Sequence, residues 1–147
     1  MNPADQYLTF ALGQEQYGLE ILRVQEIRRY PPITPIPNAP PHVRGVMNLR
    51  GIVVPVVDLR ARFGLPEAGV TPSTVVIIVA VGGKVVGLIV DAVSDVLDLG
   101  REAIDPPPDL GGSVDTSLMT GVARSGDRLT LLLDLDRLVT GAALFAT

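Results

Sequence analysis

The sequence of 147 residues contains no cysteine and no tryptophan, and aromatic residues make up only 4% of it. Without cysteine the chain can form no disulfide and offers no thiolate chemistry, which is consistent with a reducing compartment. It contains one histidine, His42, which follows a proline and is interpreted as a solvated loop residue without a metal or catalytic role. Because aromatic side chains are so few, valine, isoleucine and leucine must fill the core.

Charged residues are also scarce, at 19%, and the net charge is −4. This balance argues against a nucleic-acid partner, because phosphate binding needs clustered lysine and arginine. The hydrophobic content of 47% is sufficient for a buried core. The first residues carry no signal-peptide pattern, and the longest apolar stretch, Val75–Val81, is too short to span a bilayer. We therefore expect a single cytoplasmic domain over residues 1–147, without direct membrane insertion.

The motifs of several active-site classes are missing. The acidic residues lack the spacing of a calcium-binding loop, and the glycine pairs Gly82-Gly83 and Gly111-Gly112 lack the remainder of a phosphate-binding loop. No serine lies in the G-x-S-x-G frame of a nucleophile elbow. We therefore predict a protein that is not an enzyme and that has no cofactor and no metal site.

The chain contains a weak internal repeat. Gly45–Leu59 and Gly121–Leu135 both begin with Gly-Val and end with Asp-Leu after an apolar run, 76 positions apart. Upstream, Phe10–Ile27 matches Val79–Val96 at a spacing of 69, so the second copy has the longer connector, which carries Pro106-Pro107-Pro108. The repeat predicts two similar small units with a seam between them that can hold a partner. A chance overlay of apolar strands is the alternative.

In the first copy, Tyr7–Leu12 has the β-branched and aromatic composition of a strand. Glu20–Arg29 is the best helix candidate, because glutamate and arginine are good helix formers and its charges lie along one side. The segment Tyr30–Pro41 holds six prolines and is expected to be an extended connector.

A hairpin is predicted next, with strands at Val43–Leu49 and Ile52–Val57 and a turn at Arg50-Gly51. Because residues 52–57 are apolar throughout, we expect this strand to be buried on both faces. Pro55 cannot donate to a sheet ladder, so it predicts an edge strand or a bulge. Asp58 is expected to cap a short helix.

The second copy has the same kind of pattern. We expect a strand at Thr74–Val81, a turn at Gly82-Gly83, a long strand from Val85 to about Leu97, and a hairpin around Ser125-Gly126-Asp127. Short strands separated by regularly spaced turns favour small barrels over an open α/β sheet.

The segments EILRVQEIRRY, RGVMNLRGIVVPVVDLR and VVGLIVDAVSDVLDL resemble the CheW-like coupling proteins of bacterial chemotaxis. The resemblance runs from about Tyr7 to Val139, and its most specific part is Gly45–Leu59. It implies an all-β fold with a few short helices, in which two SH3-like five-stranded barrels pack around a shared hydrophobic core. We expect the first barrel at residues 14–68 and the second at residues 74–139, with the strand at 7–12 as a candidate to complete the second.

The same resemblance implies an adaptor without catalysis. Proteins of this family couple the cytoplasmic helical tip of methyl-accepting chemoreceptors to the regulatory domain of a sensor histidine kinase, and so scaffold the signalling array. No receiver or kinase domain accompanies the predicted barrels, so we expect a stand-alone coupler. The tail Gly141–Thr147 is shorter than the C-terminal helix of some relatives, so the contacts of that helix are not expected here.

Two groups of site residues are implied by the resemblance. Glu26 and Arg50 are expected to form a structural ion pair, which would fix the geometry of the binding surface more than it would stabilise the fold. An exposed turn residue is the alternative for Arg50. The candidate kinase-binding residues are Val24, Arg44 and Gly45, because a small residue at a strand start permits close docking. A structural turn role is the alternative for Arg44 and Gly45.

Candidate receptor-binding residues occupy related positions in the two copies. Val24 and Ile27 lie three apart, as do Val93 and Val96, and on helical backbone this spacing places both side chains on one face. We predict that these positions line an apolar surface that receives partner helices. Ordinary core packing is the alternative for each valine. The candidate receptor-binding residues are Ile27, Gly87, Val93, Val96 and Leu97.

Two other functions stay open at the level of the sequence. The chain can be a CheW-like coupler of a non-flagellar chemosensory pathway with another receptor set. From a different class, it can be a small-molecule-binding β-barrel, which predicts a concave pocket with converging polar groups. The missing cysteine, the single histidine and the scarcity of aromatic residues argue against the second possibility.

Overall fold

The computed structural model describes residues 3–107 and 117–139, and most of these residues form short strands. The strands of the first half are β1 (Gln6–Leu12), β2 (Glu15–Glu20), β3 (Val24–Arg29), β4 (Val43–Leu49) and β5 (Ile52–Asp58). Those of the second half are β6 (Val75–Val81), β7 (Lys84–Val90), β8 (Ala92–Asp98), β9 (Ile104–Asp105), β10 (Met119–Ser125) and β11 (Arg128–Leu133). The helices are α1 (Leu59–Arg62), α2 (Leu135–Val139) and the 3-10 turns Pro3–Asp5, Ile21–Arg23 and Arg101–Ala103. The tail Gly141–Thr147 and the end of the second proline-rich connector lie outside the described residues.

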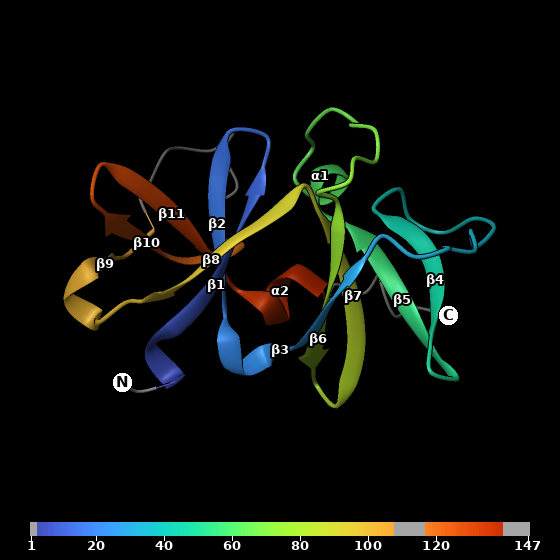
Figure 1. Cartoon of the computed structure of the whole chain (residues 1–147), viewed down its shortest axis with the longest axis horizontal. Coiled ribbons are helices and arrows are strands. Elements are labelled where there is room, and N and C mark those ends of the chain that lie inside the picture. The colour runs from blue at the N-terminus through green and yellow to red at the C-terminus, as the bar shows by residue number, and fades with distance from the viewer. Residues whose placement is uncertain (1–2, 108–116, 140–147) are drawn as a thin grey trace.

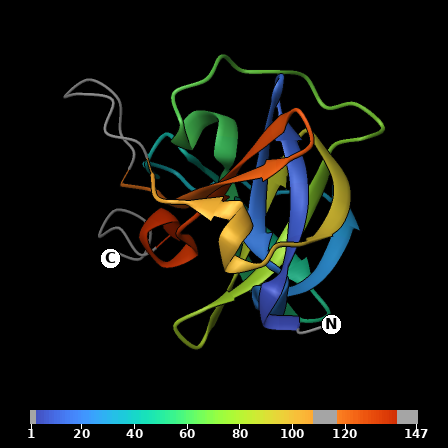
Figure 2. The same cartoon turned by 90° about the vertical axis from the view of Figure 1, so that its left-hand side faces the viewer.

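The strands form two curved sheets at opposite ends of the molecule, with α2 between them (Figure 1). The first barrel, as we call the five-stranded sheet, has the order β3-β6-β7-β5-β4. The second barrel is the six-stranded sheet with the order β8-β1-β2-β11-β10-β9. Figure 2 turns the second barrel towards the viewer and shows its strands crossing one another at steep angles. The all-β class with two barrels and a few short helices is confirmed, and the sixth strand is the two-residue β9.

The internal repeat is present in the structure strand by strand. β1 and β2 begin 69 residues before β6 and β7, while β4, β5 and α1 begin 76 residues before β10, β11 and α2. The pairing follows the same offsets, since the pair Leu8–Val96 between β1 and β8 recurs as the pair Ile77–Ile27 between β6 and β3. Even the register shift in the β1–β8 ladder has a counterpart in the β3–β6 ladder. The two copies are therefore one structural unit used twice.

The two copies exchange their first hairpins. β1 and β2 pair with strands of the second barrel, and β6 and β7 pair with strands of the first barrel. The sheets therefore do not follow the boundaries expected at residues 14–68 and 74–139, although the strand near residues 7–12 does lie in the second barrel. The physical reason is the short turn after each hairpin. Ile21–Arg23 carries the chain from β2 in one sheet to β3 in the other.

The hydrophobic core is shared between the barrels. Its largest cluster takes side chains from both sheets and both helices, including Leu8, Phe10, Leu19, Ile77, Leu88, Leu59, Leu135 and Leu138. A smaller cluster fills the first barrel around Met47, Val54, Val56 and Ile78, and another fills the second around Leu99, Ala123 and Leu132. Because the main cluster needs both sheets, neither barrel buries its apolar face without the other.

The predicted helix at Glu20–Arg29 is wrong, because this segment forms the turn Ile21–Arg23 followed by β3. Burial alternates along β3, as it does in a strand with one covered face, and its backbone pairs with β6. Helix propensity is a weak preference, and the ladder to β6 overrides it. The long strand predicted from Val85 to Leu97 is also divided. It breaks at Asp91, where the chain passes from β7 to β8 in the other sheet.

The strand β5 is buried along only part of its length. Val54, Val56 and Val57 are fully buried, whereas Ile52 is 59% exposed and Val53 is 71% exposed, so burial on both faces holds only for the later residues. Of the two alternatives expected from Pro55, the edge strand is wrong, because β5 lies between β7 and β4. The β4–β5 ladder does have a register shift nearby, between Val43 and Gly45 on β4. The parallel ladder to β7 begins only at Val56, so the missing N–H of the proline falls outside that ladder.

The predicted hairpin turns and the helix cap are confirmed. The hairpins turn at Arg50-Gly51, Gly82-Gly83 and Ser125-Gly126-Asp127. Asp58 caps α1, because its side chain accepts a hydrogen bond from the Arg60 N–H at 3.0 Å. These features depend on a few neighbouring residues, which is why the sequence is enough to predict them.

Candidate functional site

The structure brings Glu26 and Arg50 together across the first barrel. Arg50 Nη2 donates to Glu26 Oε2 at 2.5 Å, and Nη1 donates to Oε1 at 3.3 Å, which is a bidentate pair. Glu26 lies on the edge strand β3, and Arg50 lies in the turn between β4 and β5 at the other side of the same sheet. The pair therefore connects the two edges of the first barrel.

The backbone of Arg50 is in an unfavourable conformation for a side chain. Its φ is 50°, in the left-handed region, and Gly51 follows with a φ of 87°. The position 76 residues later in the repeat is Gly126, with a φ of 62°. Where the second barrel uses the residue that fits this turn without strain, the first barrel uses arginine. Strain of this kind is typical of functional positions.

The charge environment of Glu26 keeps it ionised. The hydrogen bonds from Arg50 are the main reason that the pKa of Glu26 is below its ordinary value of 4.5, and the Arg28 guanidinium, 3.6 Å away, acts in the same direction. The Arg50 side chain is 66% exposed and that of Glu26 is 29% exposed. An exposed pair contributes little to folding, so its main effect is to hold a fixed charged group at the surface.

Two apolar residues are exposed at related positions. Ile27 on β3 is 43% exposed and Val96 on β8 is 44% exposed. Both strands are edge strands of their sheets and cross the near face of the molecule in Figure 1. Val24 and Val93 were predicted to line the same apolar surface as Ile27 and Val96, but they pack against the shared core. The spacing of three does not place each pair on one face, because the backbone is strand rather than helix.

Three other candidates for receptor or kinase binding are covered. Gly87 is buried in β7, and a Cβ at this position would lie 2.7 Å from Val76 Cγ1. Gly45 is buried in β4, and a Cβ there would lie 2.1 Å from the Thr34 carbonyl oxygen. Both glycines allow close packing within the chain, and neither presents a surface for docking. Leu97 is half-buried and packs against the core of the second barrel.

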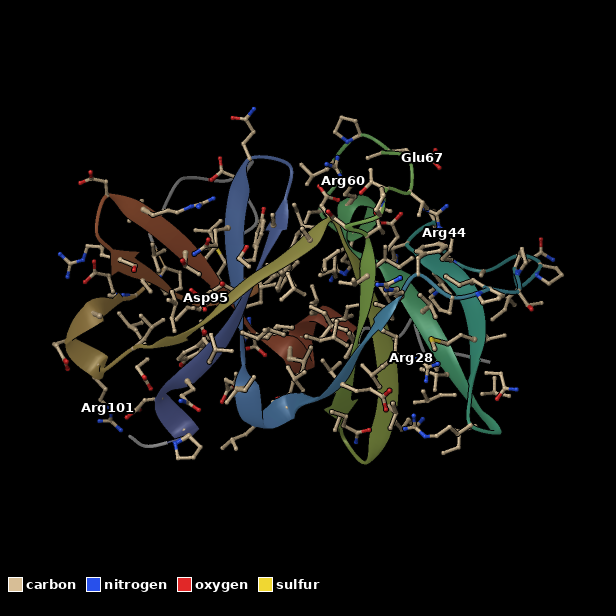
Figure 3. The ribbon with its side chains drawn as sticks, in the orientation of Figure 1. Arg28, Arg44, Arg60, Glu67, Asp95 and Arg101 are labelled. Carbon is tan, nitrogen blue, oxygen red and sulfur yellow. The ribbon has the colours of Figure 1, made fainter. Side chains whose placement is uncertain are left out.

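Arg44 lies on β4, away from the ion pair at Arg50. It donates to the carboxylate of Asp58, and its side chain remains 38% exposed. Figure 3 shows it on the same side of the molecule as Glu67, which belongs to the loop after α1. Arg44 is the exposed member of the three candidates for kinase binding.

An exposed apolar patch at the tip of the first barrel was missed by the sequence reasoning. Ile52 and Val53, at the start of β5, line a groove of about 390 Å³ together with Pro55 and Val85. The apolar run of residues 52–57 predicts burial on both faces. The turn at Arg50-Gly51 could have indicated this exposure. Residues next to a two-residue turn extend beyond the neighbouring strands and the side chains that bury the rest of the hairpin.

In the part of the chain that the structure describes, no three histidine or acidic side chains form a group that could hold a metal ion. No helix among the same residues has the length and apolar character needed to cross a membrane.

Comparisons with known proteins point to one family. The family model described as a CheW-like domain matches residues 6–143. The chain is 44% identical to the chemotaxis protein CheW of Klebsiella aerogenes over 92% of this chain and 81% of that protein. It is 31% identical to the protein FrzA of Myxococcus xanthus, over 95% and 88% of the two chains. Among solved structures, the scaffolding protein TtCheW of Thermoanaerobacter tengcongensis matches with a TM-score of 0.87 and 36% identity, over 95% of each chain.

Proposed function

Since this chain belongs to the CheW-like domain family and is a chemotaxis adaptor that couples receptors to a kinase, we propose that its two faces divide this work. The near face in Figure 1, with the edge strands β3 and β8, receives the helical tip of a chemoreceptor. The outer side of the first barrel, around β4 and the start of β5, receives the regulatory domain of the histidine kinase. The adaptor works in the cytoplasm and has no catalytic step of its own.

The observation that carries the receptor face is the strained Arg50 in its pair with Glu26. Arg50 has a left-handed backbone conformation where the second copy has glycine, and its ion pair adds little to folding. It presents a fixed guanidinium at the surface, and Ile27, whose side chain leaves β3 on the opposite face from Glu26, supplies a separate exposed apolar contact. A charged anchor and apolar side chains suit a partner helix with an apolar stripe and an acidic residue beside it.

The kinase face is supported by exposure. Arg44, near the start of β4, presents a half-exposed guanidinium, and Ile52 and Val53 form an apolar patch at the opposite end of the same β4–β5 hairpin, at its tip. Apolar residues at the centre and charged groups at the rim are the usual composition of a specific interface. This face adds the tip of β5 to the residues predicted from the sequence.

The proposal is tested by co-purification with two partners in parallel. The full chain is mixed with a chemoreceptor cytoplasmic fragment and, separately, with a kinase regulatory domain, both from the same source as the chain. We expect Arg50→Ala and Val96→Asp to weaken receptor binding by roughly tenfold or more and to leave kinase binding unchanged. Val53→Asp should do the reverse.

The matched control is Arg124→Ala in the second barrel, which removes another exposed arginine paired with a carboxylate, that of Asp105. It should leave binding to both partners unchanged. Failure of the wild-type chain to bind either partner would contradict the adaptor function. Binding of both partners with no separation between the variants would contradict the division into two faces.

A further inference from the structure

Arg44 is anchored from the inside. Its Nη2 donates to Asp58 Oδ2, and Asp58 is buried, with 7% of its surface exposed. The other oxygen of Asp58 accepts the Arg60 N–H at the start of α1. The guanidinium is therefore held in one place by a carboxylate that is itself fixed by the helix.

The outer side of the same guanidinium is held much more loosely. Arg44 Nη1 lies 3.6 Å from Glu67 Oε1, a distance at which charges attract but which is too long for a hydrogen bond. Glu67 belongs to the loop between α1 and β6, and its side chain is 81% exposed. Figure 3 shows Glu67 above Arg44 on this loop. An exposed contact of this kind contributes little to stability and is easily exchanged.

A pocket of about 290 Å³ opens beside this pair. Most of its lining surface is polar, and the apolar part comes from Pro41, Val43, Ala61 and Leu65. Apolar side chains next to a guanidinium suit a side chain with an aliphatic stem and a carboxylate end. Glutamate has this form.

The charges of the pocket favour an anion that replaces the Glu67 carboxylate over an anion that binds in addition to it. Asp58 and Glu67 both line it beside Arg44, so a free phosphate would bring further negative charge to a site that already holds two carboxylates. Replacement of Glu67 by a carboxylate from outside leaves the net charge of the pocket unchanged. The incoming carboxylate can also accept a hydrogen bond from Arg44 Nη1, which Glu67 is too far away to accept.

We propose that Glu67 holds, in the free adaptor, the place of an acidic side chain of the kinase regulatory domain, which displaces it and binds Arg44. This inference rests on the proposed function, because it specifies the chemistry of the partner at the kinase face. Glu67 is then an internal competitor that lowers the affinity of this face.

The test measures the dissociation constant of the kinase regulatory domain for four forms of the full chain: wild type, Glu67→Gln, Arg44→Gln and the double variant. We expect Glu67→Gln to tighten binding by roughly two- to fivefold, because the competitor is removed. Arg44→Gln should weaken it by roughly tenfold or more. In the Arg44→Gln background, the change Glu67→Gln should no longer tighten binding, because the two residues act through one contact.

Two controls separate this mechanism from general charge effects and from misfolding. Glu15→Gln removes another exposed carboxylate, in the second barrel, and should leave the constant unchanged. Receptor-fragment binding reports on folding and should be the same for all four forms. An unchanged or weaker constant for Glu67→Gln, or equal tightening in both backgrounds, overturns the inference and leaves the adaptor function intact. Loss of wild-type binding to both partners overturns both.

Discussion

The two barrels have the same pairing and different surfaces. The positions of Glu26 and Arg50 in the first barrel correspond, at offsets of 69 and 76, to Asp95 and Gly126 in the second. There the Asp95 carboxylate accepts the N–H of its neighbour Val96 at 2.8 Å, within its own strand. The strand pairing and the positions of the turns are the same in both copies, whereas the ion pair at the positions of Glu26 and Arg50 is present only in the first. A repeated scaffold can therefore present two different faces, because exposed residues change without cost to the ladders.

The connectors of the two barrels, by contrast, share a feature: each crosses its sheet over a buried glycine. In the first barrel Thr34 forms a bridge to Val46, and in the second Asp105 pairs with Val122, 76 residues later. Each crossing lies against a buried glycine, Gly45 or Gly121. Both connectors can pass over the sheet only because no Cβ is present at these points.

The largest expected effect comes from truncating the shared core. Leu19 on β2 and Leu88 on β7 are equivalent in the repeat and fully buried in the common cluster. We expect Leu19→Ala and Leu88→Ala each to lower the free energy of unfolding by about 3 kcal/mol. Urea unfolding followed by circular dichroism should show a single transition for both. Two separate transitions would mean that the barrels fold independently and that the core is not shared.

Substitution of the glycines under the connectors should give a smaller and unequal effect. A Cβ would lie 2.1 Å from the Thr34 oxygen at Gly45, but 2.8 Å from the Asp105 oxygen at Gly121. Gly45 also has a φ of 151°. We expect Gly45→Ala to cost about 2 kcal/mol or more in unfolding free energy and Gly121→Ala about 1 kcal/mol. Thermal unfolding measures both, and the reverse order would contradict the comparison.

The crossings between the barrels are held by ion pairs of opposite polarity. At the β7–β8 crossing, Asp91 accepts two hydrogen bonds from Arg60 of α1, at 2.8 and 2.5 Å. At the β2–β3 crossing, Arg23 donates to Asp136 of α2 at 2.7 Å. The helices are equivalent in the repeat, but α1 supplies the cation and α2 supplies the anion.

The first of these pairs is the less exposed, so its loss should cost more. Arg60 and Asp91 have 19% and 31% of their side chains exposed, against 28% and 62% for Arg23 and Asp136. We expect Asp91→Asn to lower the free energy of unfolding by about 1 kcal/mol and Asp136→Asn by less than about 0.5 kcal/mol. Chemical unfolding at neutral pH measures both values, and equal effects would contradict the difference.

The same pair should also give a pH dependence of known sign. The hydrogen bonds from Arg60 are the largest reason that the pKa of Asp91 is below its ordinary value of 3.8, and burial partly opposes them. A lowered pKa in the folded state means that the stabilisation is present above the unfolded pKa and is lost as the pH falls through the folded one. The difference in stability between wild type and Asp91→Asn should therefore shrink below about pH 4. A difference that stays constant to pH 2 would contradict this assignment.

The smallest effect on folding is expected where the effect on binding is largest. Arg50→Gly removes the exposed pair with Glu26 and also relieves the left-handed strain, as in Gly126 of the second barrel. These changes oppose each other, so the free energy of unfolding should change little. Receptor binding should still be weakened. A strongly destabilised variant would show that the pair holds the barrel together rather than serving the partner.

The candidate site could be predicted from the sequence only in part. The resemblance brought Glu26 and Arg50 together, and the structure places them in contact. It could not show that Gly45 and Gly87 are buried, because a glycine that admits a partner and one that admits its own chain have the same sequence signal. The exposure of Val53 was missed for a similar reason, since an apolar residue in a strand is read as buried until its covering elements are known.

The sequence by itself determined the features that depend on neighbouring residues: the glycine turns at Gly82-Gly83 and Gly126, the cap at Asp58, and the repeat with its two offsets. Only the tertiary structure decided which strands pair, and with it the hairpin exchange, the conversion of the predicted helix into β3, and the exposed faces of Ile27 and Val96. Hydrogen bonds in a turn or cap are made within a few residues, whereas a strand acquires its partners from distant parts of the chain. The pairing of the strands decides which residues are buried, and therefore which surfaces remain for a partner to bind.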